Sequence, residues 1–149
     1  MRNQASALHM SEGEIMIGII IAGHGNFSSE IISIAESILG KQEYLEAVSV
    51  KIGEGEYTLR NELEAALKTM DVDYVLILSD IFGGSVSNTC LYFADSRAHV
   101  GLVTGVNLPM VLKVLTYRNS VDLGELTSLA CEGGRAGILD ACETASKVK

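Results

Sequence analysis

Hydrophobic residues occur along the chain in short continuous runs that alternate with stretches of helical spacing. Residues 16–22 (MIGIIIA) are a continuous apolar run, as expected of a strand that is buried on both faces. Apolar side chains then recur at a helical interval through residues 31–39, and Gly40 is a suitable helix stop. By the same signals, the pattern predicts four strands, at residues 16–22, 45–52, 74–79 and 98–104.

Helices are predicted between and after these strands, at residues 28–39, 57–70, 85–95, 109–117 and 122–131. Ser28 is expected to open the first helix, and Pro109 suits the first turn of the fourth. The Gly133-Gly134 pair is expected to interrupt the last helix, and the tail from Arg135 is ambiguous. Strands alternating with helices predict an α/β three-layer sandwich with a mainly parallel, flavodoxin-like or Rossmann-like sheet.

The length of 149 residues suits one domain with one hydrophobic core, which we place at residues 16–149. Residues 1–15 are polar and have neither the apolar stretch nor the cleavage site of a secretory signal. We expect this leader to be disordered and to be either a cloning remnant or a loose native tail. Met10 and Met16 are then candidates for the natural start.

The formal net charge of −8 argues against binding to nucleic acid or to an anionic membrane, because both attract basic surfaces. No apolar stretch approaches the length of a membrane span. The three cysteines form no C-x-x-C pair and have no metal-ligand spacing. This usage fits a reduced, cytoplasmic protein, and we expect no metal and no cofactor.

Polar and small residues follow the first and third predicted strands, where a parallel sheet binds its ligands. His24 follows the first strand, and Asp80, Gly83, Gly84 and Ser85 follow the third. We expect His24 to face Asp80 across the edge of the sheet. A nucleophilic imidazole needs one nitrogen with a free lone pair, and a carboxylate on the other nitrogen selects that tautomer.

A phosphoryl group on the imidazole would need donors for its oxygens. Backbone N–H groups at the helix starts after Gly25 and Gly84 would supply them, with Gly83 and Ser85 in the same loop. Each residue also has a simpler interpretation. Asp80 has the residue type of a helix cap, the glycines suit a tight turn, and Ser85 suits an N-cap position.

Other motifs match less well. The segment Gly23-x-Gly25-x-x-Ser28 lacks the third glycine of a dinucleotide fingerprint, and Lys51 stands where its acidic residue is expected. His24, Asp80 and Ser85 have the residue types of a hydrolytic triad, but Ser85 is not in a G-x-S-x-G turn. A serine hydrolase remains the main alternative, and a non-catalytic flavodoxin-like binding module is a third.

Four segments resemble the IIA domains of mannose-family sugar phosphotransferase systems, in the same order along the chain. They are MIGIIIAGHG at residues 16–25, SDIFGGS at 79–85, TGVNLPM at 104–110 and GRAG at 134–137. The resemblance extends over about residues 16–140. Phe82 replaces a common tryptophan, and Val86 stands where some members have proline. Both differences would alter the surface that partners contact.

The resemblance implies a phosphotransferase component with a phosphohistidine intermediate. The phosphoryl group would pass from the histidine phosphocarrier HPr to His24 and then to the IIB component, with the membrane components IIC and IID involved indirectly. Asp80 would be the partner of His24, and Ser85 would lie near the phosphoryl group. In a related branch, the phosphoryl-donor subunit for dihydroxyacetone kinase, the sequence of the second loop is closer to D-M-G-S than to the SDIFGGS of this chain.

The resemblance also implies a homodimer. In that arrangement a C-terminal strand near Arg135 to Asp140 would complete the partner's sheet as an antiparallel edge strand.

Overall fold

The computed structural model describes residues 15–51 and 53–148, so residues 1–14 of the predicted leader at 1–15 lie outside the described residues. Its sheet consists of β1 (Ile17–His24), β2 (Leu45–Val50), β3 (Tyr74–Ser79) and β4 (Val100–Thr104). The strand order is β2-β1-β3-β4, and every pair is parallel. The predicted parallel sheet is therefore confirmed, with each strand within two residues of its expected bounds.

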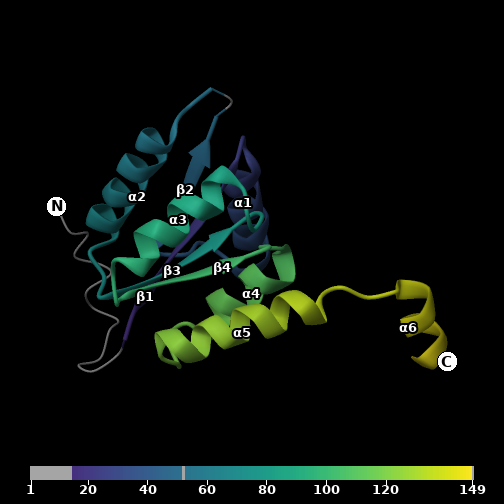
Figure 1. Cartoon of the computed structure of the whole chain (residues 1–149). Coiled ribbons are helices and arrows are strands. Elements are labelled where there is room, and N and C mark those ends of the chain that lie inside the picture. The colour runs from purple at the N-terminus through teal and green to yellow at the C-terminus, as the bar shows by residue number, and fades with distance from the viewer. Residues whose placement is uncertain (1–14, 52, 149) are drawn as a thin grey trace.

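Helices cover both faces of the sheet (Figure 1). The described helices are α1 (Phe27–Leu39), α2 (Glu56–Met70), α3 (Ser85–Asp95), α4 (Leu108–Tyr117), α5 (Leu123–Ala136) and α6 (Ala141–Val148), and α6 does not cover the sheet. Helices α1, α4 and α5 pack on one face, and α2 and α3 pack on the other. This is the predicted three-layer sandwich. Among the described residues, no helix has both the length and the apolar character needed to cross a membrane.

The two faces of β1 explain where its last residue points. Ile17, Ile19 and Ile21 are fully buried against the α1, α4 and α5 layer. Ile20 and Ala22 are fully buried on the α2 and α3 side. Side chains alternate along a strand, so His24, the last residue of β1, faces the side of the sheet that carries α2 and α3.

The start of α1 differs from the expectation. The helix begins at Phe27 with Asn26 as its N-cap residue, not at Ser28. Ser28 is completely buried, and its hydroxyl donates a hydrogen bond to the carbonyl of Val48 at 3.1 Å. Ser28 therefore ties α1 to β2 instead of capping the helix.

Helix α5 also corrects a prediction, because it runs through the double glycine instead of stopping there. A Cβ atom at Gly134 would lie 2.8 Å from Cε of Met110, and one at Gly137 would lie 2.3 Å from Cγ of Pro109. The side chain of Asn107 caps α4 and donates to the carbonyl of Gly134 at 2.9 Å. These glycines allow α4 and α5 to approach closely, and contact between helices outweighs their low helix propensity.

The expected C-terminal strand near Arg135 to Asp140 is not seen within the single chain that the structure describes. Arg135 belongs to α5, and residues 138–140 form an irregular link to α6, which lies apart from the body (Figure 1). The side chains of Ile138 and Leu139 are 76% and 65% exposed. A strand requires a neighbouring edge to pair with, and this tail leaves α5 in a direction that brings it to no edge of its own sheet.

A buried arginine holds the connection between α1 and β2. Arg118 is only 3% exposed, and its guanidinium donates to the carbonyls of Glu43 at 2.6 Å and Tyr44 at 3.1 Å. Tyr44 has a left-handed backbone, with φ of 53°, and its carbonyl also accepts from the amide of Ile19 in β1. Arg118 therefore stabilises a strained turn at the start of β2.

We expect Arg118→Met to lower the free energy of unfolding by about 2–4 kcal/mol, because it removes the buried guanidinium that donates to the carbonyls of Glu43 and Tyr44. Chemical denaturation measures this loss. Arg60→Met is the matched control, since Arg60 pairs with Glu56 on the exposed surface of α2 and should cost about 1 kcal/mol or less. Equal losses in the two variants would contradict the role given to Arg118.

Candidate functional site

The candidate site lies at the carboxyl ends of β1 and β3, the two central strands. His24 is the last residue of β1, and Asp80 directly follows β3. After β1 the chain crosses to β2, which is the neighbour of β1 on one side, whereas β3 is the neighbour of β1 on the other side. The winding direction of the sheet changes at this point, where open parallel sheets bind their ligands.

Asp80 binds both the ring and the backbone of His24. Oδ2 of Asp80 lies 2.7 Å from Nδ1 of His24 and accepts the backbone N–H of His24 at 3.0 Å. Oδ1 of Asp80 accepts the backbone N–H of Ile81 at 2.9 Å. The amide of Asp80 donates to the carbonyl of Ala22 at 3.2 Å, which joins the two loops. The carboxylate is thus fixed by three donors, and it fixes the imidazole.

The charge state of Asp80 determines the tautomer of His24. Partial burial raises the pKa of the Asp80 carboxyl, but the hydrogen bonds from His24 and Ile81 outweigh burial, so its pKa lies below the usual 3.8. An ionised carboxylate only accepts hydrogen bonds, so the proton of a neutral ring belongs on Nδ1. Nε2 then carries the free lone pair. The side chain of His24 is 52% exposed, so this nitrogen is accessible to a partner.

The simpler interpretation of Asp80 as a helix cap does not fit the structure. Helix α3 begins at Ser85, and its N-cap residue is Gly84, with no side-chain cap. The side chain of Asp80 instead turns back to Ile81 and His24. Ser85 is the first residue of the helix, not its cap.

The loop after β3 places backbone next to the imidazole. Gly83 has a φ of +83°, which side-chain-bearing residues rarely adopt. A Cβ atom at Gly84 would lie 3.9 Å from Cε1 of His24, so the backbone at the start of α3 lies beside the ring. The first amides of a helix have no partner within the helix. Helix α3 begins at Ser85, which is exposed, so these amides lie at the end of the helix nearest the ring.

Gly25 differs from this arrangement. Its own N–H donates to the carbonyl of Val50 at 2.9 Å, and its φ is +57°. The amide is thus part of the β1–β2 pairing and is not available to a ligand. Gly25 shapes the turn into α1, and any donors on this side are the first-turn amides of α1 itself.

The structure does not assemble a hydrolytic triad. Among the described residues, no hydrogen bond joins Ser85 to His24, although the His24–Asp80 half of such a triad is present. His99, the other described histidine, is exposed before β4 at the opposite end of the sheet. Within residues 15–51 and 53–148, no group of three or more His, Cys, Asp or Glu side chains is arranged to hold a metal ion.

Sequence reasoning placed both Phe82 and Val86 at the surface that partners contact, and the structure differs for Val86. Val86, expected at the surface for partners, is completely buried in the core beneath α3. Phe82 is 75% exposed in the loop that carries Asp80. The apolar side chain in a glycine-rich turn was the available signal for Phe82. The signal for Val86 was its place in the apolar stripe of α3.

The fold and the site together define a class: an open α/β domain whose candidate reactive group is an exposed imidazole, oriented by a carboxylate where the sheet changes direction. The family model described as "PTS system fructose IIA component" matches residues 18–130. The chain belongs to this family of phosphotransferase system IIA components.

Individual relatives agree. The chain is 38% identical over 112 residues to the fructose-specific EIIA component of Bacillus subtilis, covering 74% of this chain and 77% of the relative. It is 34% identical over 124 residues to the mannose-specific EIIAB component of Escherichia coli, covering 82% of this chain but only 38% of that longer protein.

Solved structures agree as well. A phosphotransferase system EIIA component from Streptococcus agalactiae has a TM-score of 0.78 at 28% identity, covering 84% of this chain and 97% of that one. Members of the family carry phosphoryl groups from HPr to the IIB component, and the chain is therefore a phosphotransferase component of this system.

Proposed function

We propose that the chain carries its phosphoryl group on Nε2 of His24 as a phosphohistidine. The 2.7 Å contact between Nδ1 of His24 and Asp80 is the observation that carries this proposal, because it leaves Nε2 as the nucleophile. Nε2 attacks the phosphorus of the phosphoryl group on HPr, and the bond to the donor breaks. A histidine of the IIB component then attacks the same phosphorus, and the bond to Nε2 of His24 breaks.

The residues around His24 have distinct roles in this proposal. Asp80 orients the ring and stabilises the positive charge that develops on it after phosphorylation. Gly83 and Gly84 allow the backbone of the loop to approach, and the first amides of α3 and the Ser85 hydroxyl bind the phosphoryl oxygens. Gly25 contributes by its turn, not by its amide. Neutral donors hold the group without a fixed cation, which suits a group that must be passed on.

The test is incubation of the chain with phosphoenolpyruvate, enzyme I and HPr, followed by intact mass and site mapping. We expect one phosphoryl group on His24 that is lost in acid and retained in base. A hydrolase would instead be labelled on Ser85 by a fluorophosphonate probe. Transfer to a dihydroxyacetone kinase in place of IIB would assign the chain to the related branch, but the double glycine of its second loop favours sugar transport.

The partners in this proposal are HPr and IIB, with IIC and IID reached only through IIB, and the location is the cytoplasm.

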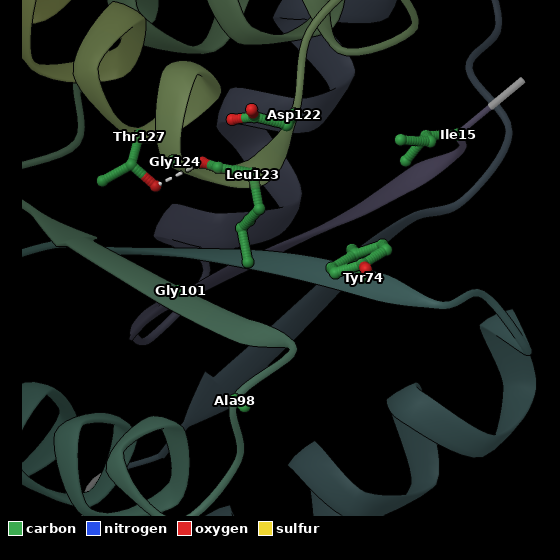
Figure 2. A pocket seen from close by; sticks show the side chains of 8 residues that line it. All are labelled: Ile15, Tyr74, Ala98, Gly101, Asp122, Leu123, Gly124 and Thr127. Atoms are coloured by element: carbon green, nitrogen blue, oxygen red, sulfur yellow. Dashed lines mark hydrogen bonds between the residues drawn. The ribbon is translucent and has the colours of Figure 1, made fainter.

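We also propose a homodimer. Within the part of the chain that the structure describes, strand β4 pairs only with β3, so its other edge has no strand beside it. A cavity of about 450 Å³ lies at the amino-terminal ends of the strands, and Figure 2 shows Leu123 and Tyr74 beside it together with Gly101 of β4. A second cavity of about 150 Å³ is lined by Val103 and Thr104 of β4, by residues of α5 and by Ile138 of the tail.

The C-terminal tail has the residues to fill such an edge. Ile138 and Leu139 are the exposed apolar residues that follow α5. Paired with β4 of a second copy, they would cover both the free edge and their own apolar surface. The strand that is missing within one chain would then form between two chains.

We expect a chain that ends at Gly137 to be a monomer at micromolar concentration, because the pairing segment is gone. A chain that ends at Asp140 lacks only α6 and should remain a dimer. Light scattering measures both. Both truncated chains retain Gly137 and its contact with Pro109 of α4. A change in oligomeric state would therefore not result from loss of the packing between α4 and α5. A monomeric full chain, or a dimer after truncation at Gly137, would contradict the proposed interface.

A further inference from the structure

Helix α6 has an apolar face that covers nothing in the single chain. None of the eight residues that the structure describes in α6 is buried, and the helix lies apart from the body (Figure 1). Its apolar residues share one face of the helix and are Ala141, Cys142, Ala145 and Val148. A helix with this pattern normally buries its apolar face, so α6 lacks the surface for which its sequence is suited.

The polar residues of α6 stabilise the helix itself. The carboxylate of Asp140 accepts the amide of Glu143 at 3.0 Å, and its carbonyl accepts the hydroxyl of Thr144 at 2.8 Å. Lys147 and Glu143 form an ion pair at 2.9 Å. A helix of eight residues is nevertheless too short to be stable in water without packing. Helix α6 therefore needs a surface to pack against.

A cavity of suitable character lies at the amino-terminal ends of the strands. Its volume is about 450 Å³, and Figure 2 shows Leu123 and the ring of Tyr74 at its wall. The polar side chains that α5 brings to this cavity are already hydrogen-bonded. Asp122 accepts the amide of Glu125 at 2.8 Å, and the hydroxyl of Thr127 donates to the carbonyl of Leu123 at 2.8 Å. The cavity therefore suits apolar side chains better than a polar ligand.

Pairing of two chains through their tails would bring α6 of one copy to this cavity in the other. Ile138 lines the smaller cavity with Val103 and Thr104, so the tail leaves α5 at the level at which β4 ends. A tail that pairs antiparallel with β4 of a second copy then enters beside Thr104 and runs toward Val100. With Ile138 beside Thr104, the first residue of α6 is beside Gly101, which lines the larger cavity.

We propose that α6 of each chain docks its apolar face in the cavity between β4 and α5 of a second copy. This inference rests on the homodimer proposed above and adds a second contact to it, which the two-fold symmetry of a dimer would form twice. The cavity lies at the starts of the parallel strands, whereas His24 is at the end of β1. The docked helix therefore leaves the candidate phosphoryl site accessible.

Disulfide trapping tests the contact directly. Cys142 lies on the apolar face of α6, and Cys131→Ser removes the other cysteine that is not fully buried. In that background, Thr127→Cys places a thiol at the cavity, and Ser128→Cys places one at the next, exposed position of α5. With diamide as the oxidant, we expect Thr127→Cys to form a covalent dimer about tenfold faster than Ser128→Cys, because a disulfide requires close approach. The background alone controls for a bond between two Cys142 side chains.

Dilution of the dimer, followed by sedimentation, measures the strength of the contact. We expect Val148→Asp to raise the dimer dissociation constant about tenfold, because it places a charge where an apolar side chain docks. Ser146→Asp is the matched control, since it adds the same charge to the last turn but outside the apolar face, and it should change the constant little. A chain that ends at Asp140 should stay a dimer at micromolar concentration with a similarly raised constant.

Equal trapping at positions 127 and 128 would overturn the docking. So would a disulfide within one chain, because α6 would then fill the cavity of its own copy. A dimer that fails both tests retains the homodimer proposal and contradicts this one, whereas a monomeric full chain contradicts both. Neither measurement uses phosphoryl transfer, and Val148→Asp should accept a phosphoryl group at the rate of the unmodified chain. The result is therefore independent of the role of His24.

Discussion

Replacing His24 with glutamine should abolish acceptance of a phosphoryl group from HPr. The bond to phosphorus forms with the lone pair of Nε2, and glutamine has no nucleophilic nitrogen to replace it. We expect the transfer rate to fall by about three orders of magnitude or more, to the background of hydrolysis. Rapid-quench transfer from phosphorylated HPr, followed by intact mass, measures this loss.

The control is His99→Gln, which removes the exposed histidine at the opposite end of the sheet. It should accept phosphate at the rate of the unmodified chain. His99 is exposed, so His99→Gln should change the free energy of unfolding by about 1 kcal/mol or less, whereas His24→Gln also loses the bond of the ring to Asp80. Undiminished labelling of His24→Gln would refute the phosphohistidine, and labelling of Ser85 by a fluorophosphonate would favour the hydrolase alternative.

The elements with the strongest local signals are the ones that sequence reasoning predicts accurately. Strand β3 and helix α3 have the predicted bounds, because a continuous apolar run and a glycine turn mark them without ambiguity. The prediction failed at Gly133-Gly134, where propensity favours a break. There the close contact of α5 with Met110 and Pro109 determines the structure, and such contact between distant helices leaves no local pattern in the sequence.

The contact between His24 and Asp80 could be predicted from the sequence, but the other hydrogen bonds of the site could not. Parallel strands bring their carboxyl ends together, so the positions of His24 and Asp80 after neighbouring strands were enough to place them in contact. The second bond of Asp80, to the backbone N–H of His24, depends on a carboxylate lying against a strand end. The hydrogen bond from the Gly25 amide to the carbonyl of Val50 in β2 depends on how β1 and β2 are aligned. Neither leaves a signal in residue types.

Changing Asp80 to asparagine should slow phosphoryl transfer by roughly ten- to a hundredfold. The carboxylate receives three donors, from the ring and backbone of His24 and the backbone of Ile81. An amide has one oxygen and an NH2 group, so at least one donor must face another donor. If the NH2 group faces His24, it favours the tautomer that protonates Nε2 and blocks the nucleophile.

The magnitude follows from the lost charge-assisted bond. Such a bond contributes about 1.5–3 kcal/mol, and each 1.4 kcal/mol changes a rate about tenfold. The low pKa of Asp80 means that its interaction with His24 is fully present above pH 3.8 and is lost as the pH falls through the folded-state pKa. The difference in stability between the unmodified chain and Asp80→Asn should therefore hold at neutral pH and shrink in acid.

Nitrogen-15 chemical shifts of the phosphorylated ring identify the attacked atom, which we expect to be Nε2. Asp95→Asn, at the exposed end of α3, is the control for a carboxylate lost elsewhere and should transfer normally. Asp80→Asn should fold, because the substitution keeps the size and shape of the side chain. Phosphorylation at Nδ1, or full transfer rates in Asp80→Asn, would show that the 2.7 Å contact has no part in the chemistry.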